Sequence, residues 1–138
     1  MTAICDPKGF EQARPVAARR HRGRRAFLSG EAAEQRVAQD YERRGFVATA
    51  RRWRGSRGEI DLVMRDGAAL VFVEVKQSGS FASAASHLSE AQMRRIYGAA
   101  EEFIGNEPNG SLTELRFDVA LVDGTGQIEI HENAFGFF

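Results

Sequence analysis

The order of elements along the chain predicts an α/β fold in which a mixed central sheet is flanked by helices. Two segments show the three- and four-residue spacing of amphipathic helices, and two others alternate with the period of paired strands. In chain order the expected elements are a helix, a strand, a hairpin, a second helix and a second hairpin. At 138 residues, one compact core with an extension is the expected arrangement.

The extension is expected at residues 1–28, and the folded domain at residues 29–138. Seven basic and two acidic residues give residues 1–30 a net charge of +5, although the whole chain is neutral. Helical periodicity is poor before Phe27, so we expect this part to be unstructured. An arginine-rich arm can lie on a nucleic-acid backbone. An ordinary solvated tail, or an incorrectly chosen translation start, is the preferred interpretation.

The first helix is predicted to begin at Ser29 or Gly30, either of which can cap it, and to run through about Arg44. One stripe of this helix carries Glu34, Val37, Ala38 and Tyr41. A glutamate is therefore aligned with the core-facing side. Gly45 ends the helix, and residues 46–52 are expected to form the first strand.

The central hairpin spans residues 59–76, with Asp66-Gly67 as the predicted two-residue turn. This register makes Asp61 and Glu74 diagonal neighbours, roughly 7–8 Å apart at the backbone. One face is then wholly apolar, with Ile60, Leu62, Met64, Ala69, Val71, Val73 and Val75. The other face carries the charged residues Glu59, Asp61, Glu74 and Lys76 beside Val63, Leu70 and Phe72.

Carboxylates gathered on one sheet face repel one another unless a positive charge lies between them. Either Lys76 and the nearby Arg57 neutralise them, or a metal ion does. Hard divalent cations such as Mg²⁺ bind a few carboxylates, backbone carbonyls and waters, which leaves room for a phosphate oxygen.

Asp61, followed after twelve residues by Glu74-Val75-Lys76, resembles the Asp…(Asp/Glu)-x-Lys signature of the restriction-endonuclease-like superfamily. More narrowly, three segments in this order resemble the YraN family of small bacterial predicted endonucleases. They are Gly58-Glu59-Ile60-Asp61-Leu62, Val71-Phe72-Val73-Glu74-Val75-Lys76 and Arg116-Phe117-Asp118-Val119. The resemblance covers roughly residues 29–138.

The resemblance implies a restriction-endonuclease-like αβββαβ sandwich and a metal-dependent endonuclease that acts on nucleic acid, with DNA expected. Asp61, Glu74 and the Val75 carbonyl would hold Mg²⁺ or Mn²⁺, and Lys76 would orient or deprotonate the attacking water. Glu34 falls where related nucleases carry an active-site glutamate. The alternative is a non-catalytic nucleic-acid-binding or adaptor domain that retains the fold.

Contacts to nucleic acid are expected from a basic segment before the acids and from the second helix. The candidates are Arg52, Arg54, Arg57, Gln77, Arg94 and Arg95. The arginines before the acids could instead offset the carboxylates, and Trp53 could stack on a base or pack in the core. The family often has a basic residue near Gln92 and more positive charge after Lys76, where this chain has Gln77, so we expect weaker binding of phosphate here.

After residues 77–86, a small-residue connection, Ser89 is expected to cap a helix through about Ile104. The second hairpin should pair residues 115–122 with residues 127–131. We interpret Asp118 as structural rather than catalytic. The apolar end, Phe135, Phe137 and Phe138, can dock on the core or bury against another subunit, which makes a homodimer an open alternative.

Several classes of protein are not expected. The chain has no apolar run of about 18 residues, so no membrane span is predicted. Cys5 is the single cysteine, which excludes an internal disulfide and fits the cytoplasm. The three histidines lack paired metal-ligand spacing, so zinc is not expected.

Overall fold

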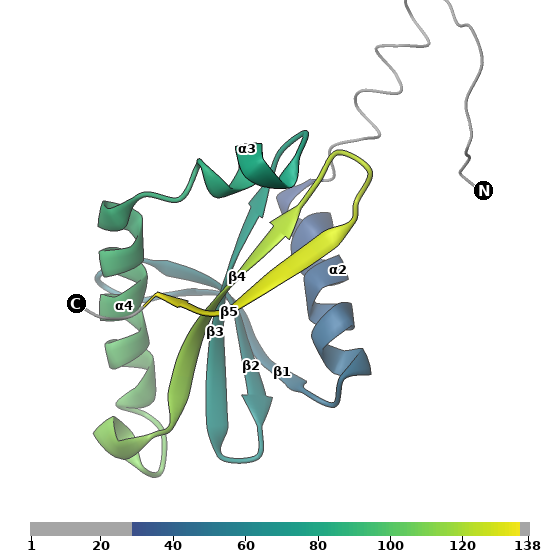
Figure 1. Cartoon of the computed structure of the whole chain (residues 1–138). Coiled ribbons are helices and arrows are strands. Elements are labelled where there is room, and N and C mark those ends of the chain that lie inside the picture. Colours follow the sequence, from purple (N-terminus) through teal and green to yellow (C-terminus); the bar gives the residue numbers. More distant parts are fainter. Residues whose placement is uncertain (1–28, 136–138) are drawn as a thin grey trace, which may run out of the picture.

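The computed structural model describes residues 29–135, in which a five-stranded mixed sheet lies between helices (Figure 1). The strands are ordered β1-β2-β3-β4-β5 across the sheet. This confirms the predicted α/β architecture with a mixed sheet.

The elements are α2 (Gly30–Arg43), β1 (Val47–Arg54), β2 (Glu59–Asp66), β3 (Ala69–Gln77), α3 (Phe81–Ala85), α4 (Glu90–Ile104), a 3₁₀ turn (Gly110–Leu112), β4 (Leu115–Val122) and β5 (Ile128–Phe135). The predicted extension, with Cys5, and the last two phenylalanines lie outside the described residues.

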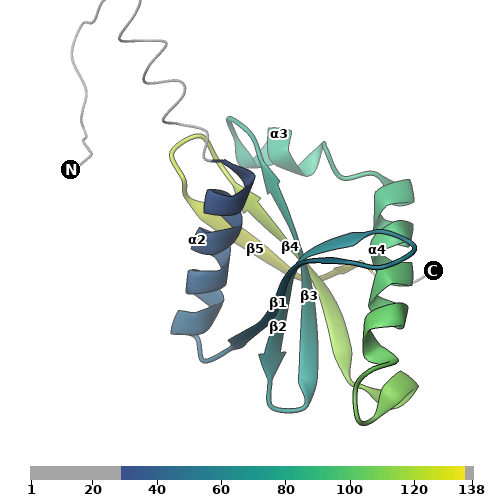
Figure 2. The ribbon, with the colours of Figure 1, turned by 180° about the vertical axis from the view of Figure 1, so that it is seen from behind.

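The sheet is mixed because two kinds of connection build it. Tight turns join β1 to β2, β2 to β3 and β4 to β5, and each of these pairs is antiparallel. The connection from β3 to β4 passes through α3 and α4, and it returns the chain parallel to β3. Helices α2 and α4 therefore cover opposite faces of the sheet, as the views in Figures 1 and 2 show.

Both long helices begin where the sequence predicts. Ser29 Oγ accepts a hydrogen bond of 3.0 Å from the amide of Ala32 at the start of α2. Ser89 Oγ accepts one of 3.1 Å from the amide of Gln92 at the start of α4. Gly45, with φ of +97°, follows α2 in the left-handed region that glycine tolerates best. Local chemistry thus sets the start of both long helices and the end of α2.

The connection after β3 is more regular than its composition suggests. Residues 81–85 form the short helix α3, and Ser80 Oγ accepts a hydrogen bond of 3.1 Å from the amide of Ser83. Ala84 is fully buried in the core on the α4 side. Small side chains here allow the turn to pack closely, so tertiary contacts stabilise a segment of weak local preference.

Two hydrophobic cores lie on the two faces of the sheet. The core on the α2 side is formed by Ala33, Val37, Ala38, Tyr41, Leu62, Met64, Val71, Val73, Ala120 and Val122. The core on the α4 side is formed by Ile60, Val63, Leu70, Phe72, Ala84, Ile96, Ala99, Ala100, Ile104, Phe117, Val119, Leu121 and Phe135. The alternation of β3 explains this division, because Val71 and Val73 face one helix and Leu70 and Phe72 the other.

The turn of the central hairpin differs from the predicted one. Asp66 pairs with Ala69, so Gly67 and the following alanine are the two loop residues. Gly67 has φ of +63°, as the first central residue of a primed turn of this kind requires, whereas the predicted register needed Asp66 in that position. Each strand moves by one residue, so Val63 pairs with Phe72, and this register, if continued, would set Asp61 directly across from Glu74 instead of diagonal to it. The ladder ends at Leu62 and Val73, before it reaches these two residues.

One residue of the predicted apolar face lies on the opposite face. Ile60 packs in the core on the α4 side, whereas Leu62, two residues later, packs in the core on the α2 side. The pairing of β2 with β3 ends at Leu62 and Val73, so β2 leaves the regular ladder before Ile60. The prediction was wrong for Ile60 because it assumed strict alternation through this departure.

Strand β5 extends four residues beyond its predicted end, to Phe135. The Phe135 side chain is buried, and its ring centroid lies 5.1 Å from that of Phe117. This phenylalanine therefore docks on the core of its own chain. Among residues 29–135, no helix is long and apolar enough to cross a membrane.

Candidate active site

The central feature of the site is an acidic pair, Asp61 on β2 and Glu74 on β3, at the point where these strands separate. Beyond the last ladder pair of β2 and β3, Asp61 Oδ2 accepts a hydrogen bond of 2.8 Å from the Val75 amide. The carboxylate thus satisfies an amide that a continuing antiparallel ladder would have paired with a carbonyl. The separation of the strands is what admits a side chain here.

Glu74 is held from two further directions. Its Oε2 accepts a hydrogen bond of 2.7 Å from Gln92 Nε2 on α4 and lies 3.0 Å from Lys76 Nζ, two residues along the same strand. The Glu74 side chain is only 5% exposed and that of Lys76 18%. A carboxylate so buried needs such partners, and both approach the same oxygen.

Burial and mutual repulsion shift the acidity of this site. Burial, followed by the negative charge of Glu74, raises the pKa of Asp61 to about 7. The Val75 amide lowers this pKa, a hydrogen bond with Glu74 raises it, and the charge of Lys76 lowers it. The acidic pair therefore favours one proton or one additional cation between its two carboxyl groups.

Glu34 approaches from α2 on the core-facing stripe, as the sequence predicts. Its side chain is 12% exposed, and Oε1 accepts a hydrogen bond of 2.8 Å from Arg52 Nε on β1. Burial raises the pKa of Glu34 most, the hydrogen bond from Arg52 opposes this, and the charge of Asp61 adds to it. Glu34 thus lies within electrostatic reach of the acidic pair but is bound to an arginine.

Within the described part of the chain, no three acidic, histidine or cysteine side chains stand close enough together to hold one metal ion. The acidic pair nevertheless suits a hard divalent cation, because the half-buried Asp61 and the buried Glu74 carboxylates repel each other and a +2 charge relieves that repulsion. Magnesium commonly takes one or two carboxylates and completes its sphere with waters. The predicted role of the Val75 carbonyl stays a prediction, as do the roles of Glu34 and Lys76.

The arginines predicted to bind nucleic acid have different partners. Arg52 reaches Glu34, an acid of the site, as described. Arg54 lies 3.8 Å from Glu59. Arg57 lies 3.1 Å from Glu101 on α4. The exposed ion pairs of Arg54 and Arg57 contribute little energy, so both side chains can leave them for a phosphate.

The remaining predicted contacts lie on α4 and at the end of β3. Exposed Arg94 lies 3.1 Å from Glu90, one turn earlier in α4. Arg95 is also exposed, and its backbone and Cβ lie against Gly58 in the β1–β2 hairpin. Figure 2 shows this hairpin reaching toward α4. Gln77 is the last residue of β3 and is half-buried.

Trp53 packs against the core, which is the structural one of the two roles expected for it from the sequence. Its ring packs edge-on against Phe103 of α4, with 5.2 Å between ring centroids, and it lies against the core on the α4 side. An indole in this position stabilises the end of the β1–β2 hairpin. Stacking on a base would require the ring to leave this contact.

Sequence reasoning did not assign two residues that the structure brings to the site. Gln92 was noted only as a place where related chains have a basic residue, yet it hydrogen-bonds Glu74 across 18 positions of sequence. Arg51 was not singled out, and its guanidinium contacts the Gln35 side chain of α2. The signal for Gln92 was its place in the first turn of a capped helix, and the signal for Arg51 was its place in the basic segment before the acids.

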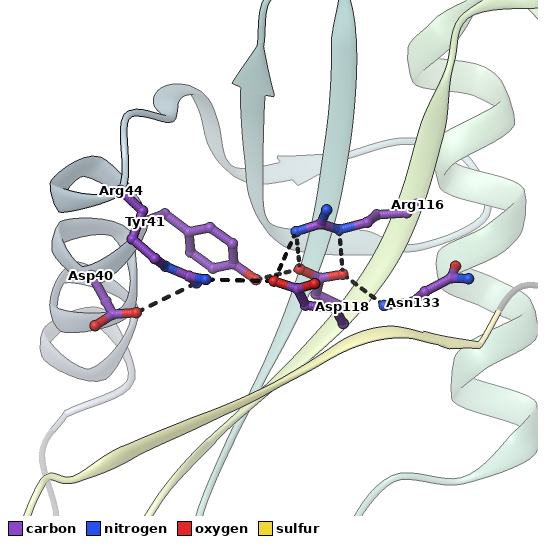
Figure 3. A network of polar contacts seen from close by, with 7 residues as sticks. Asp40, Tyr41, Arg44, Arg116, Asp118 and Asn133 are labelled. Carbon is purple, nitrogen blue, oxygen red and sulfur yellow. Dashed lines mark hydrogen bonds and ion pairs between the residues drawn. The ribbon is translucent and has the colours of Figure 1, made fainter.

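Asp118 belongs to a structural network on the α2 face (Figure 3). It is fully buried and accepts hydrogen bonds from the Tyr41 hydroxyl at 2.7 Å and the Asn133 amide at 2.9 Å. Arg116 donates two more, of 2.9 and 3.1 Å. Four donors satisfy this carboxylate, which supports the structural interpretation.

Comparison with known proteins agrees with the family resemblance found in the sequence. The model of "Uncharacterised protein family UPF0102" matches residues 33–122. A UPF0102 protein of Ruegeria pomeroyi is 62% identical over 115 residues, which cover 83% of this chain and 94% of the relative. A UPF0102 protein of Cereibacter sphaeroides is 60% identical over 113 residues, covering 82% and 97%. One of Roseobacter denitrificans is 54% identical over 117 residues, covering 85% and 91%.

Proposed function

The chain belongs to the UPF0102 family, and we propose that it is a metal-dependent endonuclease that hydrolyses phosphodiester bonds in nucleic acid, with DNA as the expected polymer. The acidic pair carries this proposal, because half-buried Asp61 and buried Glu74 lie together where two strands separate, with Lys76 beside them. Two carboxylates and a lysine of this order match the signature of restriction-endonuclease-like nucleases. We assign the fold to that superfamily on the same grounds.

In the proposed mechanism, Asp61 and Glu74 would hold Mg²⁺ or Mn²⁺, aided by the Val75 carbonyl. The ion, when bound, would lower the pKa of a coordinated water and neutralise charge on the phosphate. Gln92 keeps one Glu74 oxygen in place, so that the other is available to the cation. Glu34 would hold a second ion or a water.

Hydrolysis forms a bond from a water oxygen to phosphorus and breaks the bond from phosphorus to one bridging oxygen. The water gives up a proton and the leaving oxygen takes one up. Lys76 orients that water and, in its neutral form, accepts the proton, while in its charged form it stabilises the developing negative charge. Its Nζ lies 3.0 Å from Glu74 Oε2, which places the amine beside the proposed metal ligand.

The proposal is tested with a panel of single-stranded, duplex, flapped and branched DNA in Mn²⁺. Wild type should cleave at least one substrate, and Lys76→Ala and Glu74→Gln should lower the rate by more than about 100-fold. The circular dichroism and the thermal midpoint of both variants should stay close to those of the wild type. Arg43→Ala, on the exposed last turn of α2, serves as the matched control.

Two results would contradict the enzyme hypothesis. Intact substrates together with no Mn²⁺ binding by calorimetry would remove both the activity and its cofactor. Alternatively, a Glu74→Ala variant with unchanged DNA binding and an unchanged cellular effect would favour the non-catalytic binding or adaptor domain.

A further inference from the structure

Arg52 has a backbone conformation that is unusual for a strand residue with a side chain. Its φ is +47°, in the left-handed region that is sterically disfavoured for all residues but glycine. As a result, Ala50 and Trp53 both pack against the core on the α4 side, although they are three residues apart. Arg51 and Arg52, which are consecutive, both contact α2. The strained residue thus turns two neighbouring guanidinium groups toward one helix.

The Arg52 guanidinium lies against the first turn of α2. A Cβ placed on Gly30 would come within 2.8 Å of its Nη2, and Nη1 lies 4.0 Å from Glu31 Oε2. The amino end of a helix carries partial positive charge, so a cation there is electrostatically unfavourable without acidic partners. Glu31 and Glu34 supply those partners. A strained backbone and an unfavourable electrostatic position at one residue point to a functional role.

The same residue stands next to the acidic pair. In the β1–β2 ladder, Arg51 pairs with Leu62 and Trp53 with Ile60, so Arg52 lies across from Asp61. The Arg52 side chain is 44% exposed, which leaves it room to turn. It also lines an open pocket of about 380 Å³ whose walls are Glu31, Glu34, Gln35, Arg51 and Arg52.

We infer that Arg52 is an exchangeable counter-cation of the site. Without a divalent ion it neutralises Glu34; when an ion binds, Arg52 leaves Glu34 and grips a phosphate of the nucleic acid from the pocket on the α2 side. This inference rests on the proposed function, and it adds the element that couples metal binding to substrate binding.

Charge and geometry both support this exchange. A divalent ion at the acidic pair repels a nearby guanidinium and attracts the Glu34 carboxylate, which already senses the charge of Asp61. The released guanidinium presents a planar fork that matches two oxygens of a phosphate. Arg51, on the same side, adds a second positive charge to the same pocket.

The test compares Arg52→Gln with wild type by two measurements. The first is Mn²⁺ affinity by calorimetry without DNA, and we expect it to rise three- to tenfold in the variant because a competing cation is gone. The second is the affinity for a labelled short DNA duplex in Ca²⁺, which should fall about tenfold. Arg52→Lys should keep a Mn²⁺ affinity close to that of the wild type.

Arg54→Gln removes the same charge from the same strand without touching Glu34, and its Mn²⁺ affinity should change less than twofold. If Arg52→Gln does not fold, Arg52→Gly replaces it, because glycine accepts the left-handed backbone.

Unchanged or weaker Mn²⁺ binding in the Arg52 variant overturns this inference about Arg52 and leaves the proposed function standing. Tighter Mn²⁺ binding with unchanged DNA affinity overturns the phosphate contact. Absence of Mn²⁺ binding by the wild type overturns the proposed function as well.

Discussion

The clearest physical test of the site concerns Asp61 and the dependence of stability on pH. Its pKa is raised from 3.8 to about 7 by burial and by Glu74. Between these values the folded chain binds a proton that the unfolded chain has released, so this group stabilises the fold at low pH. That stability is lost as the pH rises through about 7. From pH 5 to pH 8 the loss is about 2 to 3 kcal/mol, as an upper estimate.

Asp61→Asn should remove this dependence. The asparagine carbonyl can still accept the hydrogen bond from the Val75 amide, and its NH₂ group can donate to Glu74, as a protonated aspartic acid does. At pH 5 the variant and wild type should therefore have similar free energies of unfolding. At pH 8, in a chelator, the variant should be more stable by about 1 to 3 kcal/mol.

The assay is urea denaturation followed by circular dichroism at several pH values, with and without Mn²⁺. Saturating Mn²⁺ at pH 8 should stabilise wild type by mass action and leave Asp61→Asn unchanged. Asp66→Asn, in the exposed turn at the end of the same strand, is the control and should follow the wild-type curve. Parallel pH profiles for wild type and Asp61→Asn would refute the argument that partial burial and the charge of Glu74 raise the pKa of Asp61.

Two further predictions concern residues that support the site and the fold. Gln92→Ala should weaken Mn²⁺ affinity about tenfold in calorimetry, because Glu74 loses the donor that fixes one of its oxygens; an unchanged affinity would show that Gln92 has no such role. Asp118→Ala should lower the free energy of unfolding in urea by about 3 to 5 kcal/mol, because Arg116 and the Tyr41 hydroxyl lose a buried acceptor. A loss below about 1 kcal/mol would contradict the structural role of Asp118.

Local rules predicted much of the fold. The capping serines Ser29 and Ser89 mark the starts of both long helices, and Gly45 marks the end of the first, as expected from their chemistry. The pattern of the central hairpin predicted that Asp61 and Glu74 lie close together, and in the structure they are neighbours just beyond the last ladder pair of β2 and β3.

The site was only partly predictable, because some of its contacts join residues far apart in sequence. The ion pair of Arg52 with Glu34 and the hydrogen bond of Gln92 to Glu74 each span 18 positions of sequence and link a helix to a strand. The spacing of apolar residues along the sequence does not predict contacts between side chains of different elements. The change of face at Ile60 was also missed, since it depends on where two strands separate.

The sequence by itself determined which charged residues lie within the otherwise apolar central hairpin. It also determined the family to which this chain belongs. Side-chain alternation and capping are properties of short stretches of backbone, so they can be read locally. Tertiary structure alone decided that Asp61 fills a gap between β2 and β3 and that an arginine in a left-handed conformation holds Glu34. Packing between distant segments holds the strained backbone of Arg52, and burial raises the pKa of Asp61. A short stretch of sequence contains neither kind of information.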